Sequence, residues 1–267
     1  MDFAKRYGPW ALIAGGSEGT GASFARKLAA RGLNLVLIAR RQEPLAALAA
    51  EIGNEFGVAC IAASIDLAKD DASVKVIEAV GSREVGLFIN NAGSDTNSSL
   101  FLDRELGGWE QLIRLDVMNV MRNCHHFGRR MRERGRGGII LVGSGACYGG
   151  LNGIAVYCGV KSFDLCFGEG LWAELRDQGV DVLNLVLGQT DTPAHRLLRE
   201  QLGLPTPQGM AAADDVAELG LARLRHGPVC NWGSGDEEPG FGPISPAQRR
   251  SRILAVEEAS KAYARKQ

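Results

Sequence analysis

The sequence predicts one α/β domain in which a doubly wound parallel sheet of about seven strands carries helices on both faces. Two observations lead to this prediction. Short apolar runs alternate with amphipathic stretches along the whole chain, and repeated strand–helix–strand order requires parallel strands joined by right-handed crossovers. The apolar runs are also nearly continuous in Val, Ile and Leu, which is typical of strands that are buried on both faces.

Each apolar run is expected as one strand of the sheet. The expected strands are Trp10–Ala14, Leu33–Ala39, Val58–Ala63, Val85–Asn90, Gly138–Gly143, Val180–Leu187 and Val229–Trp232. The amphipathic stretches between them, in which apolar residues recur at helical spacing, are expected as helices. They lie at about 20–31, 42–56, 70–81, 105–134, 154–177 and 212–225.

No linker or break in composition divides the chain, so residues 1–267 are expected to form a single domain. The segment 190–210 is the longest insertion between sheet elements, and it follows the carboxyl end of a strand. Ligands of open α/β sheets bind outside those ends, so this segment is expected to be a substrate lid. Residues 233–267 are expected to form a turn-rich loop and a final helix at about 247–265.

Composition excludes several classes of partner. The 267 residues are 45% apolar, and 30 basic residues face 31 acidic ones. Such a balance gives no field that would concentrate nucleic acid or an anionic membrane. The chain has no apolar run of bilayer length and no signal-like start, so a cytoplasmic protein is expected. The six cysteines include no CxxC pair, so reduced thiols and no metal site are expected.

A glycine-rich turn follows the first expected strand and opens a helix. Its glycines have the spacing Gly-x-x-x-Gly-x-Gly. Glycines in such a turn let backbone N–H groups and the helix N-terminus approach a pyrophosphate. An ordinary tight turn is the alternative, but the position on the first strand–helix crossing favours a nucleotide. The residues expected to hold it are Gly15, Ser17, Glu18, Gly19, Thr20 and Gly21.

The end of the second expected strand bears on which nicotinamide cofactor binds. An NAD site usually places Asp or Glu here to hold the ribose 2′-hydroxyl. The sequence has Ala39 followed by Arg40 and Arg41, and guanidinium groups bind a 2′-phosphate well. Two solvated arginines at a helix start are the alternative, although cations are disfavoured there. NADP(H) is therefore favoured, and NAD(H) stays possible.

Tyr157 and Lys161 stand four residues apart in an expected helix, so their side chains leave the same face. A free phenol has a pKa near ~10, and a neighbouring cation favours the phenolate. A phenol tuned in this way can exchange a proton with a carbonyl oxygen near neutral pH. Ser144, at the end of the fifth expected strand, could hydrogen-bond the same oxygen.

Together these features resemble the short-chain dehydrogenase/reductase family in its common, single-domain, Rossmann-like form. The resemblance runs from Trp10 to about Trp232, and its parts occur in the family's order. They are Gly15-x-x-x-Gly19-x-Gly21, Asp66-Leu67, Asn90-Asn91-Ala92-Gly93, Ser144, Tyr157-x-x-x-Lys161 and Gly188-Gln189-Thr190-Asp191-Thr192.

The resemblance implies positions along a bound cofactor. Asp66 and Leu67 would meet the adenine edge, and Asn91, Ala92 and Gly93 would line the ribose side. Taken alone, Asp66 is more typical of a helix N-cap and Asn91 of a turn. The loop after the sixth strand, through Gly188, Thr190 and Thr192, would hold the carboxamide and the pyrophosphate.

The resemblance also implies catalytic roles. Tyr157 would exchange the proton, Lys161 would bind the nicotinamide ribose and depress the tyrosine pKa, and Ser144 would steady the substrate oxygen. Where the family usually has an asparagine that anchors a water on the lysine, this sequence has Asp116. If the backbone carbonyl does that work, aspartate serves unchanged. A carboxylate near Lys161 would instead strengthen its charged form and alter the proton relay.

The sequence thus predicts an NADP(H)-dependent oxidoreductase that interconverts a ketone or aldehyde with its alcohol. The alternative is a non-catalytic NADP(H)-binding sensor of the same fold, and epimerisation or dehydration is a third possibility. The substrate is expected to be small to medium-sized and apolar, bound by Ser94–Thr96, Ala146–Asn152 and Thr192–Leu204. By resemblance, the two long helices 105–134 and 154–177 would pair the chain into a homodimer or homotetramer.

Overall fold

The computed structural model describes residues 2–93, 99–201, 208–239, 244–251 and 254–255. Its main sheet has seven strands in the order β3-β2-β1-β4-β5-β6-β9, and every neighbouring pair is parallel. These strands are β1 Trp10–Ala14, β2 Asn34–Ala39, β3 Cys60–Ser64, β4 Val85–Asn90, β5 Gly137–Ser144, β6 Val180–Leu187 and β9 Val229–Asn231. The prediction of a doubly wound parallel sheet in a single domain is confirmed.

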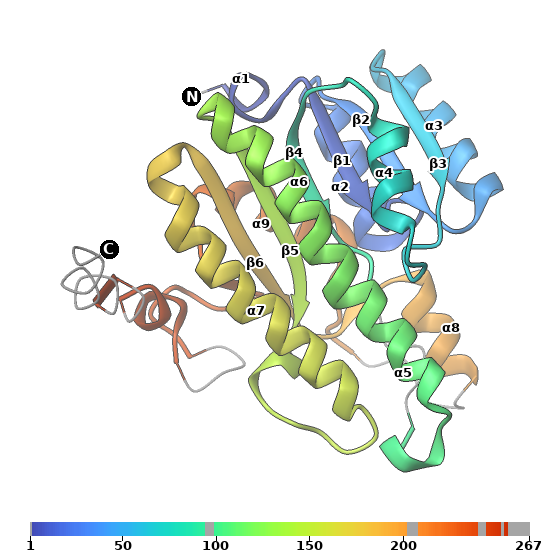
Figure 1. Cartoon of the computed structure of the whole chain (residues 1–267), viewed down its shortest axis with the longest axis vertical. Coiled ribbons are helices and arrows are strands. Elements are labelled where there is room, and N and C mark those ends of the chain that lie inside the picture. Colours follow the sequence, from blue (N-terminus) through green and yellow to red (C-terminus); the bar gives the residue numbers. More distant parts are fainter. Residues whose placement is uncertain (1, 94–98, 202–207, 240–243, 252–253, 256–267) are drawn as a thin grey trace.

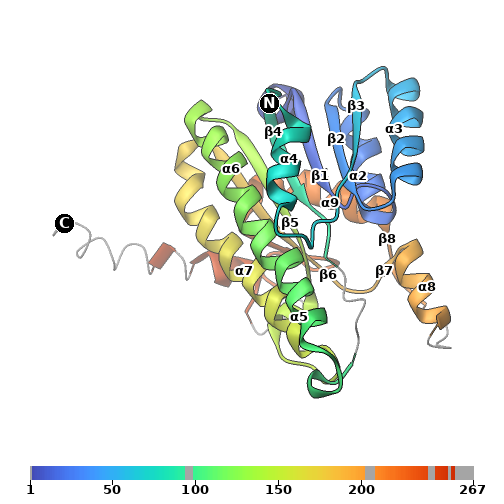
Figure 2. The same cartoon turned by 45° about the vertical axis from the view of Figure 1, so that its right-hand side comes forward.

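Helices cover both faces of the sheet (Figure 2). One layer comprises α2 Gly19–Ala29, α3 Gln42–Phe56 and α9 Ala213–Arg223; the other comprises α4 Ala72–Val80, α6 Asn119–Arg134 and α7 Ala155–Leu175. Successive residues of β1 pack alternately into the two layers, with Ala11 and Ile13 in one core and Leu12 and Ala14 in the other. Because both faces are covered, the strands have to be apolar at nearly every position.

The long helix expected at 105–134 is continuous but not uniform. It begins as α5 Leu106–Ile113, passes through a π-helical turn at Arg114–Met118 and continues as α6. In Figure 1, α6 and α7 run side by side across one face of the sheet. The π turn inserts one residue into the helix, so it changes which side chains face α7.

Several short elements were not expected from the sequence. A first helix, α1 Phe3–Tyr7, precedes the sheet, and the predicted lid contains β7 Thr190–Asp191 and α8 Pro193–Gln201. The strand β8 Ala211–Ala212 follows directly after the lid. β7 pairs with β8. Single 3₁₀ turns lie at Phe101–Asp103, Gly145–Tyr148, Arg176–Gln178 and Leu224–His226. Residues 246–251 are helical, and most of the final helix expected at 247–265 falls outside the described residues.

The parallel strands place their carboxyl ends at one edge of the sheet, and the strand order reverses between β1 and β4. A ligand crevice is expected at such a switch point. Among the described residues, no helix is both long and apolar enough to cross a membrane. No group of three or more His, Cys, Asp or Glu residues in this described part is placed to hold a metal ion.

Candidate functional site

The turn between β1 and α2 is so tight that its first and last glycines have no room for a side chain. Gly15 has a φ of +80°, and a Cβ there would lie 2.7 Å from the backbone nitrogen of Ala92. A Cβ on Gly21 would lie 1.9 Å from the carbonyl oxygen of Gly15. No described side chain caps the first turn of α2. Its backbone N–H groups are therefore available to an anion.

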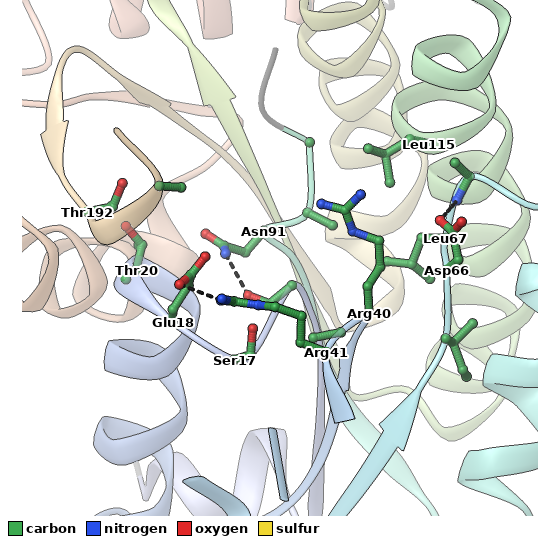
Figure 3. A pocket seen from close by; sticks show the side chains of 18 residues that line it. Ser17, Glu18, Thr20, Arg40, Arg41, Asp66, Leu67, Asn91, Leu115 and Thr192 are labelled. Atoms are coloured by element: carbon green, nitrogen blue, oxygen red, sulfur yellow. Dashed lines mark hydrogen bonds and ion pairs between the residues drawn. The ribbon is translucent and has the colours of Figure 1, made fainter. Parts of the chain in front are cut away.

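A cavity of about 510 Å³ opens beside this turn, at the carboxyl ends of β1 to β4. Figure 3 shows the side chains that line it. Predicted cofactor residues in its wall are Gly15, Ser17, Glu18, Gly19, Thr20, Arg40, Arg41, Asp66, Leu67, Asn91, Ala92, Gly93 and Thr192. Predicted cofactor residues that are not in its wall are Gly21, Tyr157, Lys161, Gly188 and Thr190.

Two arginines and one glutamate carry the charge on the β2 side of the cavity. The Arg41 guanidinium donates a hydrogen bond to Glu18 Oε2 at 2.6 Å, in an exposed ion pair. Figure 3 shows the Arg40 side chain directed away from this pair, and Arg40 has no carboxylate partner in the described part of the chain. The structure therefore leaves one guanidinium group open to a phosphate and holds the other with a carboxylate.

Asn91 and Asp66 both shape backbone as well as lining the cavity. Asn91 Nδ2 donates to the Gly15 carbonyl oxygen at 2.9 Å and so ties the end of β4 to the glycine turn. Asp66 Oδ1 accepts from the backbone N–H of Ala68 at 3.1 Å. Asp66 thus stabilises a local turn and does not cap α4, whose N-cap is Asp71. The contact of Asp66 and Asn91 with a cofactor stays a prediction.

Two contacts of His195 hold the start of the loop that follows β6. Thr192 Oγ1 accepts a hydrogen bond from the backbone N–H of His195 at 3.2 Å, which caps the start of α8. The His195 ring contacts the Thr190 carbonyl oxygen through Nδ1 at 3.0 Å. Gly188 is exposed. Of the three substrate segments, Ser94–Thr96 and the end of Thr192–Leu204 lie outside the described residues.

Ser144 and Tyr157 flank the turn that joins β5 to α7. Ser144 is the last residue of β5, and its Oγ accepts from the backbone N–H of Ala146 at 3.3 Å. Tyr157 lies in the first turn of α7 and packs against the apolar cluster of Trp109, Leu112 and Val160. Both residues are thus at the carboxyl edge of the sheet, as the sequence predicts. Their catalytic roles stay a prediction.

Lys161 is buried between two carboxylates. Only 1% of it is exposed, and its Nζ contacts Asp116 Oδ1 at 2.8 Å and Asp164 Oδ2 at 3.2 Å. The same Nζ lies 5.9 Å from the centre of the Tyr157 ring. The expectation that a carboxylate at position 116 would meet Lys161 agrees with this geometry.

Gly93 connects this buried cluster to the cavity. Gly93 lines the cavity and has a φ of +128°. A Cβ on it would lie 2.0 Å from Asp116 Oδ1 and 2.9 Å from Lys161 Nζ. The Lys161 ammonium therefore stands directly behind the cavity wall, separated from it by a residue without a side chain.

Burial and neighbouring charges act in opposite directions on the pKa values of Lys161 and Asp164. Burial alone would lower the pKa of Lys161, but the charges of Asp116 and Asp164 outweigh it and raise that pKa. Burial raises the pKa of Asp164 from 3.8 to about 6, although the Lys161 charge lowers it. Lys161 therefore stays charged, and Asp164 takes up a proton far more readily than an exposed aspartate.

The sequence analysis missed Asp164. One signal was available, because Asp164 follows Lys161 by three residues and so shares its helix face. It also stands between the apolar residues Phe163 and Leu165. What the sequence does not show is that this face of α7 is buried against the π turn that carries Asp116.

A comparison with protein-family models matches residues 9–203 to the short chain dehydrogenase family. The chain belongs to the short-chain dehydrogenase family. It is therefore an oxidoreductase, and the cavity lies where a parallel sheet of this kind binds its nucleotide.

Curated relatives of this dehydrogenase include a 7beta-hydroxysteroid dehydrogenase from Clostridium sardiniense. It is 30% identical over 227 residues, which are 84% of this chain and 85% of that protein. A very-long-chain 3-oxoacyl-CoA reductase from Neurospora crassa is 31% identical over 218 residues, or 80% of this chain. The match spans 65% of the reductase.

Solved structures of similar proteins agree with the fold along almost the whole chain. A structure from a study of 7beta-hydroxysteroid dehydrogenase stereoselectivity has a TM-score of 0.81 at 25% identity, and the match covers 95% of this chain and all of that one. A short-chain dehydrogenase from Sphingobium yanoikuyae in complex with NADPH has a TM-score of 0.74 at 28% identity, over 96% and 95% of the two chains.

Proposed function

We propose that this dehydrogenase uses NADP(H) to interconvert a ketone or aldehyde with its alcohol, with Tyr157 as the acid and base. The observation that carries the proposal is the position of the Lys161 ammonium. It lies 5.9 Å from the Tyr157 ring centre and directly behind Gly93 in the cavity wall. A phenol beside an ammonium group that stands behind the cavity wall is suited to proton transfer near a bound nicotinamide.

The cavity residues fit a dinucleotide phosphate. The uncapped first turn of α2 and the close approach of Gly15 and Gly21 suit a pyrophosphate. Arg40 is free to bind a 2′-phosphate, and Ala39 offers no carboxylate to a ribose 2′-hydroxyl. A similar dehydrogenase from Sphingobium yanoikuyae was solved with NADPH. When bound, the cofactor supplies or accepts the hydride.

The chain's own residues would manage the oxygen of the substrate. In reduction, the Tyr157 O–H donates its proton to the carbonyl oxygen as the hydride reaches the carbonyl carbon, and in oxidation the phenolate takes the alcohol proton. The Ser144 hydroxyl donates a hydrogen bond to the same oxygen and orients it. The Lys161 ammonium holds the nicotinamide ribose and steadies the negative charge of the phenolate.

The substrate we favour is an apolar ketone with a ring or a long alkyl chain. Leu100, Phe101, Leu102 and Leu106 are exposed just before Trp109, which belongs to the apolar cluster against which Tyr157 packs. Exposed apolar side chains that gather in one segment are suited to contact with an apolar ligand. Relatives named for hydroxysteroids and very-long-chain 3-oxoacyl-CoA agree with this class.

Oxidation of NADPH, followed by nicotinamide absorbance with a panel of apolar ketones, tests the proposal. We expect turnover with NADPH in preference to NADH and its loss in Tyr157→Phe. Tyr7→Phe is the matched control, because the Tyr7 hydroxyl donates to Asp181 Oδ2 at 2.6 Å near the amino end of β6, away from the cavity. Binding of NADPH without turnover on any substrate would favour the sensor, and conversion without net cofactor consumption would favour epimerisation or dehydration.

The proposed assembly is a homodimer or homotetramer formed through α6 and α7 of a protein that works in the cytoplasm. Cys166 is exposed on α7, whereas Trp172 of the same helix packs in the core. Light scattering at micromolar concentration tests this assembly, and a monomer would contradict it.

A further inference from the structure

Two carboxylates share one ammonium in the interior of this protein. Lys161, Asp116 and Asp164 are each no more than 1% exposed. Asp116 comes from the π turn and Asp164 from α7, three residues after Lys161. Pairing a buried lysine requires one carboxylate, so the second one is an addition that burial of the lysine does not explain.

In the described part of the chain, the titratable groups around Asp164 come from three elements, the π turn, α6 and α7. Lys161 and Asp116 act on its charge most strongly after burial itself, and Tyr157 acts on Lys161. Cys124 of α6 is the remaining neighbour, and burial, together with the Asp164 charge, raises its pKa and keeps the thiol neutral. One positive and two negative charges therefore face one another here. The cluster carries a net charge of −1 once both carboxylates have ionised.

The phenol lies within the reach of this charge. Lys161 Nζ is 3.2 Å from Asp164 Oδ2 and 5.9 Å from the centre of the Tyr157 ring. The Asp164 oxygen is therefore at most about 9 Å from the ring, a distance over which partly buried charges interact appreciably. A lone lysine beside the phenol favours its phenolate, and a cluster with one surplus negative charge opposes it.

We propose that Asp164 is a positioning residue whose carboxylate offsets the Lys161 charge, so that the Tyr157 phenol keeps its proton into the alkaline range and the enzyme reduces carbonyl groups there. The inference rests on the proposed function, in which reduction needs the phenol and oxidation needs the phenolate. Asp164 acts through Lys161 and touches neither substrate nor cofactor in this scheme. The pH range of reduction is widened upward, and oxidation is restricted to more alkaline solutions.

The direct test measures phenol ionisation in the protein without substrate. The chain has 4 tyrosines, so tyrosinate absorbance is titrated in the wild type and in its Tyr157→Phe variant, and the difference isolates Tyr157. The same pair is prepared with Asp164→Asn. From the distance above, we expect the Tyr157 midpoint to fall by about one pH unit in Asp164→Asn. An unchanged midpoint overturns the inference.

Two further variants separate charge from packing. Asp164→Glu keeps the charge and is expected to keep the wild-type midpoint. Asp116→Asn removes the other carboxylate charge and is expected to lower the midpoint in the same direction. If Asp164→Asn failed to fold, Asp116→Asn would still decide the matter, because a midpoint that stayed in place or rose would contradict the charge argument.

The kinetic test follows turnover against pH in both directions with NADPH and NADP⁺. In Asp164→Asn, the pH at which the rate of reduction declines and the pH at which the rate of oxidation rises are both expected to fall by about one unit. The KM of the ketone is expected to change little. If the variant is active and its pH–rate profiles do not shift in either direction of the reaction, the inference is overturned. A shifted tyrosinate midpoint in a protein that turns over no substrate would instead refute the proposed function and leave the electrostatic inference standing.

Discussion

Replacement of Asp164 by Asn should make the protein more stable at neutral pH and not at acidic pH. Burial raises the pKa of Asp164 from 3.8 to about 6. A raised folded-state pKa means that the folded protein binds the proton more tightly than the unfolded chain does. The contribution of this group to the free energy of unfolding is therefore fully present below about pH 4 and is lost as the pH rises to about 6.

The size of this loss follows from the shift in pKa. Roughly two pKa units correspond to about 3 kcal/mol of unfolding free energy. An asparagine at position 164 does not ionise, so its variant escapes the loss. Relative to the wild type, we expect Asp164→Asn to gain about 3 kcal/mol between about pH 4 and pH 7. For a domain of this size that is a difference of roughly 6–12 °C in Tm.

Thermal unfolding measured across this pH range by calorimetry checks the prediction. Asp177→Asn is the matched control, because the Asp177 side chain is 83% exposed and its replacement should give a difference that does not change with pH. A Tm difference for Asp164→Asn that is the same at all pH values would show that Asp164 does not titrate in this range. The reasoning from burial would then be refuted.

Two other predictions concern the cavity. Glu18→Gln releases Arg41 from an exposed 2.6 Å ion pair, and such a pair is worth up to about 1 kcal/mol. NADPH should therefore bind up to about fivefold more tightly, whereas the affinity for NADH should change little. Fluorescence titration of both cofactors checks this, and equal changes in the two affinities would contradict it. Gly93→Ala places a Cβ 2.0 Å from Asp116 Oδ1 at a φ of +128°, so it should cost about 1–3 kcal/mol of stability or more and weaken NADPH binding. Gly149→Ala, with open space around its Cβ, is the control in thermal unfolding.

The sheet was predictable because its strands satisfy one strong constraint. A strand covered on both faces must be apolar at consecutive positions, and runs such as Val85–Asn90 and Val180–Leu187 meet this condition. The glycine turn was predictable for a similar reason. Close backbone contacts of Gly15 and Gly21 allow no other residue, so the local sequence reports the local structure directly.

α8 was missed although its sequence contains a start signal. Thr192 followed by Pro193 is an N-cap with proline at the first helical position, and the structure shows the Thr192 hydroxyl in this role. The π turn at Arg114–Met118 is a different case. Apolar and polar residues still recur there at helical spacing, and where the extra residue is inserted depends on what the helix packs against.

The pairing of Glu18 with Arg41 also depends on the folded chain. These residues are 23 positions apart and come from different strand–helix connections, which the parallel register of β1 and β2 brings together. From the sequence, both arginines were equal candidates for a 2′-phosphate. The structure distinguishes them, because Glu18 holds Arg41 and leaves Arg40 with no carboxylate partner among the described residues.

Asp164 lowers the stability of the protein at neutral pH, and its packing does not explain why it is an aspartate. A buried carboxylate that is ionised at neutral pH lowers the stability of the fold, and an asparagine of the same shape would avoid this loss. About 3 kcal/mol is a substantial part of the 5–15 kcal/mol that holds an ordinary domain folded. Groups that lower stability and lie against the reacting residues are typical of functional sites. The effect of Asp164 on the Tyr157 phenol, rather than its packing in α7, is therefore the property that explains why an aspartate stands there.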